Sequence, residues 1–219
     1  MSDEKELIPA STLGETTLDL ASFVASAVPW IGGPVSNGLG GVSIGRKLGR
    51  VRSVLEGLVK DLSEFKSEAS VTYVATEDFE ELLAQTLKRA ADERNEEVRD
   101  VYRAFLTDAI ESPGEPYDEQ IRFLRTLEGI QPDHLRLLKA LSQPPDPNRG
   151  MVGSPNQTLL RRLPDFEEER IADLVGQLND LRITNLARLK VMMTGRGAQD
   201  LHQTIAPYGN RLLRYIVEA

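Results

Sequence analysis

The sequence predicts a mainly α protein, with an N-terminal helical bundle followed by a C-terminal winged-helix-like domain that carries one β-hairpin. Apolar residues recur at spacings of three and four along most of the chain, proline and glycine cluster between these segments, and strict alternation is confined to residues 188–206. We therefore expect a flexible acidic N-terminus over residues 1–16, the helical bundle over 17–130 and the winged-helix-like domain over 131–219.

The first half of the chain predicts a series of amphipathic helices. Residues 17–28 form a short helix that stops before Pro29, because the residue preceding a proline is pushed out of the helical region. Thr76 and Asn95 are the expected N-caps of two later helices, the second of which ends at the stretch SPGEP. Between the first helix and Thr76, apolar residues recur at alternating spacings of four and three. This seam is typical of a helix packed nearly parallel to its neighbours, and it consists of Ile44, Leu48, Val51, Leu55, Leu58, Leu62 and Phe65.

The second half adds shorter helices and the hairpin. Pro116 and Pro132 each stand in the first turn of an expected helix, where proline is tolerated. The prolines and glycines at residues 142–155 predict a connecting loop. After it we expect helices over residues 154–163 and 166–182, then a hairpin over 188–206 that turns at the stretch TGRG, and a closing helix from Pro207.

Composition limits the class of protein. The chain has 219 residues, of which 40% are hydrophobic, enough to bury one larger core or two small ones. It contains no cysteine, which excludes disulfides and thiolate zinc sites and is typical of a reducing cytoplasm. The net charge of −8 argues against non-specific nucleic-acid binding by the whole molecule. The acidic N-terminus is unlike a secretory signal, so we expect a cytoplasmic location, peripheral to the inner membrane at most.

One predicted helix has a small residue at every fourth position: Gly41, Gly45, Gly49, Ser53 and Gly57. Each glycine inside a helix costs about 0.5–1 kcal/mol relative to alanine, so close packing must offset the loss. This ridge and the Leu/Val seam occupy different faces, so the helix can bury one side and offer the other for close backbone approach. The approaching partner is the preceding segment ASFVASAVPWIGG, a second copy of the chain in a homo-oligomer, or a bilayer.

The bilayer alternative rests on the charge-free stretch before the ridge. In this interpretation residues 20–52 engage an anionic membrane surface, with Trp30 at the interface and four cations on the headgroups: Arg46, Lys47, Arg50 and Arg52. Glycine and proline weaken the hydrophobic driving force of this stretch, and no uninterrupted apolar run of about 20 residues is present. The sequence therefore favours packing within the chain or in an oligomer.

A winged helix also raises the question of DNA binding. The helix over residues 166–182, which would enter the major groove, is acidic, and phosphates would repel it. The hairpin is basic, so the alternative function, a DNA-binding transcription regulator, would rest on contacts from Arg188, Lys190 and Arg196. The charge pattern favours a structural or protein-binding domain, with nucleic acid not expected as a partner.

Nothing in the sequence predicts catalysis, a metal or a cofactor. His134 and His202 are far apart, and neither has a second ligand at metal-binding spacing. His134 suits a capping or solvent role at a helix start, and His202 is expected on an exposed strand position. The carboxylates are spread around helices as on solvated faces, and neither a phosphate loop nor a nucleophile elbow is present. We therefore expect that the protein is not an enzyme.

Four stretches of the chain together resemble the bacterial Abi-alpha family, named for abortive infection. They are Tyr102–Leu106, PDHLRLLKAL, LVGQLNDLRITN and TIAPYGNRLLRYI, and the resemblance spans residues 76–217. The sequence departs from the family pattern at Leu181–Ile183 and Ala206–Gly209, and no catalytic residue is carried over. The resemblance implies a bacterial or phage-encoded cytoplasmic helical protein connected with phage defence. We therefore expect a non-enzymatic interaction or effector protein of a bacterial stress or phage-defence system, in which residues 20–52 mediate oligomer packing or membrane engagement.

Overall fold

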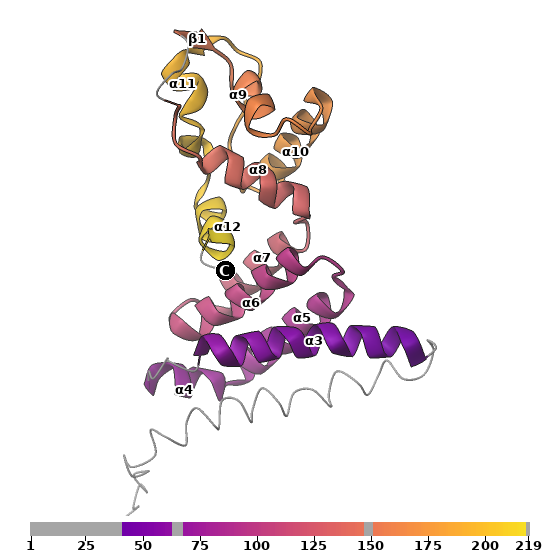
Figure 1. Ribbon diagram of the computed structural model, residues 1–219. Coiled ribbons are helices and arrows are strands. Elements are labelled where there is room, and N and C mark those ends of the chain that lie inside the picture. The colour runs from indigo at the N-terminus through magenta and orange to yellow at the C-terminus, as the bar shows by residue number, and fades with distance from the viewer. Residues whose placement is uncertain (1–40, 63–67, 147–150, 218–219) are drawn as a thin grey trace, which may run out of the picture. The chain divides into compact units, whose positions relative to one another are not determined.

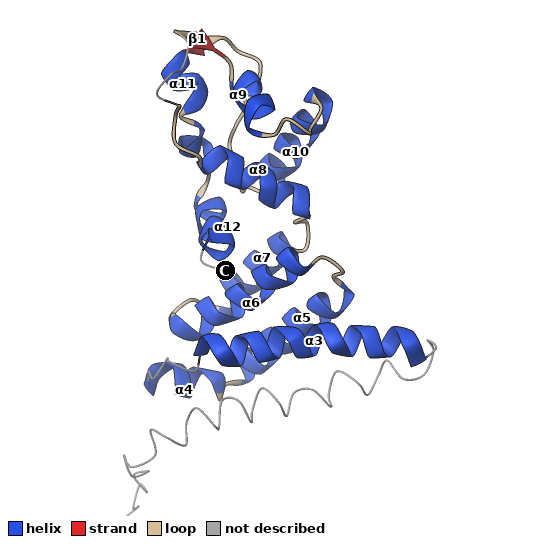
Figure 2. Cartoon of the chain, viewed as in Figure 1, coloured by secondary structure: helices blue, strands red, loops and turns tan. Residues whose placement is uncertain are grey.

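The computed structural model describes residues 41–62, 68–146 and 151–217 (Figure 1). Within these ranges the chain forms ten α-helices, one 3-10 helix and one two-stranded antiparallel sheet (Figure 2). The prediction of a mainly helical protein is therefore confirmed. The helix predicted over residues 17–28 and the tryptophan at position 30 lie outside the described residues.

The elements follow in chain order. The first are α3 (Gly41–Leu62), α4 (Glu68–Val74), α5 (Glu77–Asp92), α6 (Glu96–Glu111) and α7 (Tyr117–Leu127). Next come α8 (Pro132–Ser142), strand β1 (Val152–Gly153), α9 (Pro155–Arg162) and α10 (Glu168–Asp180). Strand β2 (Met193–Thr194), α11 (Gly195–Gln199), the 3-10 helix η1 (Leu201–Thr204) and α12 (Pro207–Val217) complete the described chain.

The chain divides into two compact units. The first comprises the described residues up to Arg94 together with Tyr102–Ile121, and the second comprises Asn95–Val101 together with the described residues from Arg122 onward. Helices α6 and α7 therefore contribute residues to both units.

Several helices begin where the sequence predicts. The Thr76 hydroxyl accepts a hydrogen bond from the Phe79 N–H at 3.3 Å and caps α5. Asn95 Oδ1 accepts from the Val98 N–H at 3.1 Å at the start of α6. Pro132 is the first residue of α8. These short-range signals fix the starts because each one satisfies, or removes, an unpaired N–H of a first helical turn.

In the first unit, α3 makes its main contacts with α5. The seam predicted for α3 is buried from Val51 to Leu62, while Leu48 is 36% exposed at its edge. Helix α4 was not expected from the sequence. Its Ser70 hydroxyl donates to the carbonyl oxygen of Ile110 at 2.5 Å, and its Tyr73 hydroxyl donates to Gln120 Oε1 at 2.7 Å, so contacts distant in sequence hold this short helix.

In the second unit, α8 lies at the centre and contacts α9, α10, α12 and η1. Its apolar side chains are almost fully buried and form the core of the unit with those of α10: Leu135, Leu137, Leu138 and Leu141 from α8, and Ile171, Leu174 and Leu178 from α10. The burial of these apolar side chains away from water is the main source of stability in such a unit.

The predicted hairpin over residues 188–206 is wrong. Strand β2 pairs with β1, Val152 opposite Thr194, so the partner strand lies inside the stretch predicted to be a loop. The expected second strand is instead helical, in α11 and η1, and His202 lies exposed in η1. The physical reason lies in the stretch TGRG: the Thr194 hydroxyl accepts from the Gly197 N–H at 3.2 Å, which caps a helix where the alternation suggested a turn.

The end of α10 fixes the position of α12. The N–H of Arg182 donates to the Asn179 carbonyl and that of Ile183 to the Leu178 carbonyl, both at 2.9 Å, the pattern of a Schellman motif. Arg182 adopts the left-handed conformation, with φ of 58°. The next residues form a bridge between Thr184 and Ile205, and the Ala206 N–H donates to the Ile183 carbonyl at 2.9 Å just before α12 begins.

Candidate functional site

Helix α3 presents a row of small residues on its exposed side. Gly45, Gly49 and Ser53 are exposed, and a Cβ placed on either glycine would meet no atom within 4 Å. Residues four positions apart share one ridge of a helix. We call Gly45, Gly49 and Ser53 the open ridge, because no described residue packs against its two glycines. Gly41, the first residue of α3, continues the series.

The last glycine of the series is in a different position. A Cβ on Gly57 would lie 2.5 Å from Cδ of Arg103, whose Nε forms an ion pair with Asp61 Oδ2 at 3.0 Å. The Arg103 side chain of α6 therefore packs against this glycine within the first unit. It does not pack against Gly45 or Gly49.

The four cations predicted to contact an anionic surface lie in two different environments. Lys47 Nζ is 2.5 Å from Asp92 Oδ1, and Arg50 Nη1 donates to the carbonyl oxygen of Ala91 at 2.9 Å. Both partners are at the C-terminal end of α5, which is negative and has unpaired carbonyls. Lys47 and Arg50 therefore join α3 to α5. Arg46 is exposed, and Arg52 forms an exposed ion pair with Glu56 at 2.9 Å, so these two cations face solvent.

The cations predicted for the DNA-binding alternative do not act as one group. Arg188 and Arg196 are exposed, but Lys190 Nζ lies 2.5 Å from Glu168 Oε1 on α10. The hydrogen bond to this carboxylate raises the pKa of Lys190. One of the three predicted contacts is therefore neutralised by the acidic helix that would face the phosphates.

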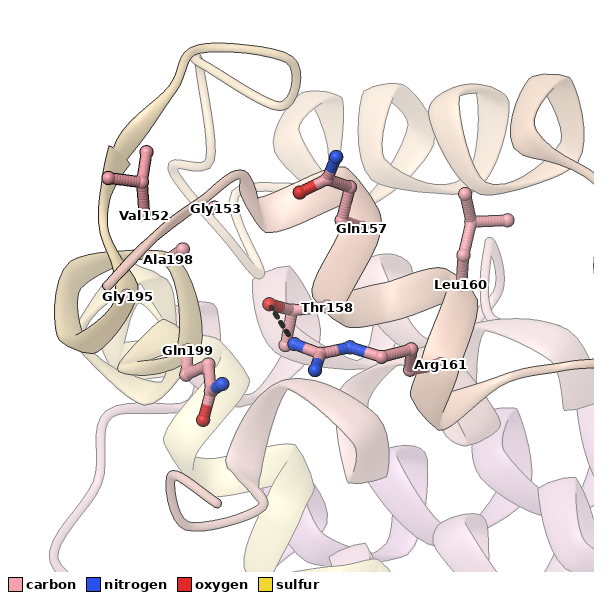
Figure 3. Close-up of a pocket in the computed structure, with 9 residues that line it drawn as sticks. All are labelled: Val152, Gly153, Gln157, Thr158, Leu160, Arg161, Gly195, Ala198 and Gln199. Carbon is pink, nitrogen blue, oxygen red and sulfur yellow. Dashed lines mark hydrogen bonds between the residues drawn. The ribbon is translucent and has the colours of Figure 1, made fainter. Parts of the chain in front are cut away.

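A hollow of about 480 Å³ lies between β1, α9 and α11 (Figure 3). In Figure 3 the Arg161 side chain turns back along α9 to Thr158, whereas Val152 lies at the left of the view, on the strand next to α11. Four large apolar side chains on or near the two strands are exposed. We call this group the apolar tip, and it consists of Met151, Val152, Val191 and Met192. No sequence pattern indicated the apolar tip, because its two parts come from a predicted loop and a predicted hairpin.

The two histidines are not brought together as ligands. His134 is buried in α8, where its Nδ1 accepts from the Gln131 N–H at 3.1 Å, so of the two predicted roles the capping role is confirmed and the solvent role is wrong. His202 Nδ1 lies 2.8 Å from Asp200 Oδ1. Across residues 41–62, 68–146 and 151–217, no three His, Asp or Glu side chains are grouped as a metal site requires. None of the helices described is long and apolar enough to cross a membrane.

We expect the protein to lose stability as the pH falls below about 6.5, because His134 is neutral in the folded state. Since Nδ1 accepts a hydrogen bond, the proton is on Nε2, which donates to Gln177 Oε1 at 2.8 Å. Burial lowers the pKa of His134, and the charge of Arg170 adds to this. Below the unfolded value of 6.5 the unfolded chain therefore binds a proton that the folded chain does not, and stability decreases towards the lower folded pKa.

Urea unfolding midpoints at about pH 7.5 and about pH 5.5 test this expectation in the wild type and in His134→Gln. The glutamine keeps a hydrogen-bonding side chain but does not titrate. Its midpoint should therefore change less between the two pH values than that of the wild type. An equal change in both proteins would show that other groups cause the acid sensitivity.

Comparisons of the chain with protein-family models, with curated proteins and with solved structures give no match. The function is therefore inferred from the surfaces of the chain itself.

Proposed function

We propose that the protein is a cytoplasmic, non-enzymatic interaction protein of a bacterial stress or phage-defence system, in which α3 packs closely against a second helix through the open ridge. The observation that carries the proposal is the pair of open glycines, Gly45 and Gly49, on a helix whose opposite face is buried. The resemblance of residues 76–217 to the Abi-alpha family supports the setting in phage defence.

The cost of the two glycines favours a packing role. Each lowers helix stability by about 0.5–1 kcal/mol relative to alanine. The space around both positions would accept a methyl group, so no contact with a described residue requires glycine there. A helix packed on the ridge does require it, because glycine lets two backbones approach within a distance that larger side chains prevent. We favour a second copy of the chain as the source of this helix.

We expect Gly45→Leu combined with Gly49→Leu to convert a self-associated protein to monomers, because the leucines hold the two backbones apart. The measurement is the molar mass by light scattering. Gly114→Leu is the matched control, since a Cβ at that position also meets no atom within 4 Å. The control should leave the mass unchanged.

The same samples distinguish the other occupants of the ridge. A monomeric wild type that loses thermal stability in the double variant would assign the ridge to a segment of its own chain and would contradict the interaction proposal. A wild type that floats with anionic liposomes, and no longer floats when Arg46 and Arg52 are replaced, would identify a bilayer as the partner. A stable oligomer that tolerates both leucines would place the interface elsewhere.

A DNA-binding regulator is the second candidate, and the order of elements in the second unit favours it. Helix α8, strand β1, helices α9 and α10 and strand β2, with the two strands paired, follow the order of a winged helix as far as its second strand. Two features depart from a DNA-binding winged helix. Helix α11 occupies the part of the chain that would form the wing. Glu168 and Glu169 make the start of α10 acidic. Duplex binding with a steep salt dependence, abolished by charge reversal at Arg188, Lys190 and Arg196, would favour this function.

A further inference from the structure

A hollow of about 570 Å³ lies in the second unit, between α7, the end of α10 and the start of α12. Its lining includes three arginines and one carboxylate: Arg122 and Arg125 from α7, Arg182 after α10, and Asp180 at the end of α10. All three arginine side chains are on exposed positions, so solvent and solutes reach them. None of these residues belongs to the open ridge, and the inference does not depend on the proposed function.

The charge of this hollow is opposite to that of the chain. The lining residues carry three guanidinium groups and one carboxylate, so their formal charges sum to +2, in a chain whose net charge is −8. A phosphate monoester carries close to two negative charges at neutral pH. The planar guanidinium group matches phosphate oxygens with paired N–H donors, so arginine is the preferred residue for recognising this group.

The rest of the lining is mainly apolar and includes one aromatic ring. Leu181 and Tyr208 belong to it, and the rings of Tyr208 and Phe123 pack in a T-shaped arrangement with their centroids 5.2 Å apart. An aromatic ring fixed in this way offers a stacking surface for a nucleobase. A ligand that combines a phosphate with a flat base therefore suits both the arginines and the aromatic ring of this lining.

The backbone at Arg182 gives an independent reason to connect this arginine with a ligand. It occupies the left-handed position that follows a helix in a Schellman motif, where glycine is favoured because it has no Cβ. The fold alone would be more stable with glycine here. Strained backbone of this kind is concentrated at functional sites, where the side chain has a task that glycine cannot perform.

We infer that the hollow between α7, α10 and α12 binds a nucleoside monophosphate, with its phosphate on Arg122, Arg125 and Arg182 and its base against Tyr208. The interaction is reversible binding without a covalent step. It would make the second unit a nucleotide-responsive part of the protein.

Isothermal titration of the full chain tests the inference, with AMP as the probe and adenosine and inorganic phosphate as its two halves. We expect AMP to bind with one site per chain, phosphate to compete with it, and adenosine to bind at least about tenfold more weakly than AMP. Absence of AMP binding, or adenosine binding as tightly as AMP, would overturn the inference.

Two variants test the assignment to this hollow. Arg125→Gln and Arg182→Gly should each weaken AMP binding at least about tenfold, and Arg182→Gly should at the same time raise the thermal midpoint. The matched control is Arg161→Gln, which removes an exposed arginine from the other hollow of the same unit. AMP binding that is unchanged in both test variants, or that is lost in the control instead, would overturn the assignment.

Discussion

Replacing Gly209 with alanine is expected to lower the free energy of unfolding by about 3 kcal/mol, which is the largest effect we predict for a single methyl group. Gly209 is buried in the first turn of α12. A Cβ there would overlap the carbonyl oxygen of Ile183 and would lie 2.7 Å from Cγ2 of Ile205. The Ile183 carbonyl cannot move away freely, because it accepts the hydrogen bond from the Ala206 N–H at 2.9 Å.

Chemical denaturation measures this loss, and Gly176→Ala is its matched control. Gly176 is an exposed residue of α10, and a Cβ there would meet no atom within 4 Å. The free energy of unfolding of the control should rise by about 0.5–1 kcal/mol, because alanine has a higher helix propensity than glycine. If Gly209→Ala were as stable as the wild type, the close approach of α12 to the Ile183 backbone would be wrong.

Replacing Arg162 with methionine is expected to lower the free energy of unfolding by about 3 kcal/mol, because three carbonyl groups lose a charged hydrogen-bond donor. The guanidinium donates to the carbonyl oxygens of Ala140 at 2.7 Å, Pro144 at 3.1 Å and Gln199 at 3.2 Å. It therefore joins the last turn of α8, the segment after α8 and the end of α11. Arg162 is half-buried, and this burial, followed by the charge of Arg161, lowers the pKa of its guanidinium group.

The neighbouring Arg161→Met separates this network from the general effect of removing an arginine from α9. Arg161 is exposed, and its hydrogen bond to the Thr158 hydroxyl is long at 3.5 Å. This control should change stability by no more than about 0.5 kcal/mol. Equal losses in the two variants, measured by thermal or urea unfolding, would contradict a specific role for Arg162.

The elements that the sequence predicts correctly are those defined by neighbouring residues. The caps at Thr76 and Asn95 and the proline at the start of α8 act within one helical turn, so they can be recognised without the rest of the chain. The seam of α3 is correct from Val51 to Leu62 because its buried face follows the helical period. Local chemistry was sufficient in each case.

The errors occur where distant residues decide the structure. Alternation predicted that residues near Met193 pair with the following segment, but the Gly195 N–H donates to the Met151 carbonyl at 2.8 Å, about 40 positions earlier. Helix α4 is held by Ser70 and Tyr73 through partners on later helices. The arginine hollow combines α7 with the end of α10, and no pattern within either segment predicts that they meet.

The pairing of β1 with β2 also constrains the order in which the second unit can fold. The ladder pairs Val152 with Thr194 and encloses all of α9 and α10, so forming it closes a loop of about 40 residues. Two residues on each strand form too few contacts to offset the entropy lost in closing that loop. Helices α9 and α10 must therefore dock on α8 first, through side chains such as Leu159 and Leu174, and shorten the distance to be closed. The two strands therefore pair late in folding, after the helices between them in the sequence have docked.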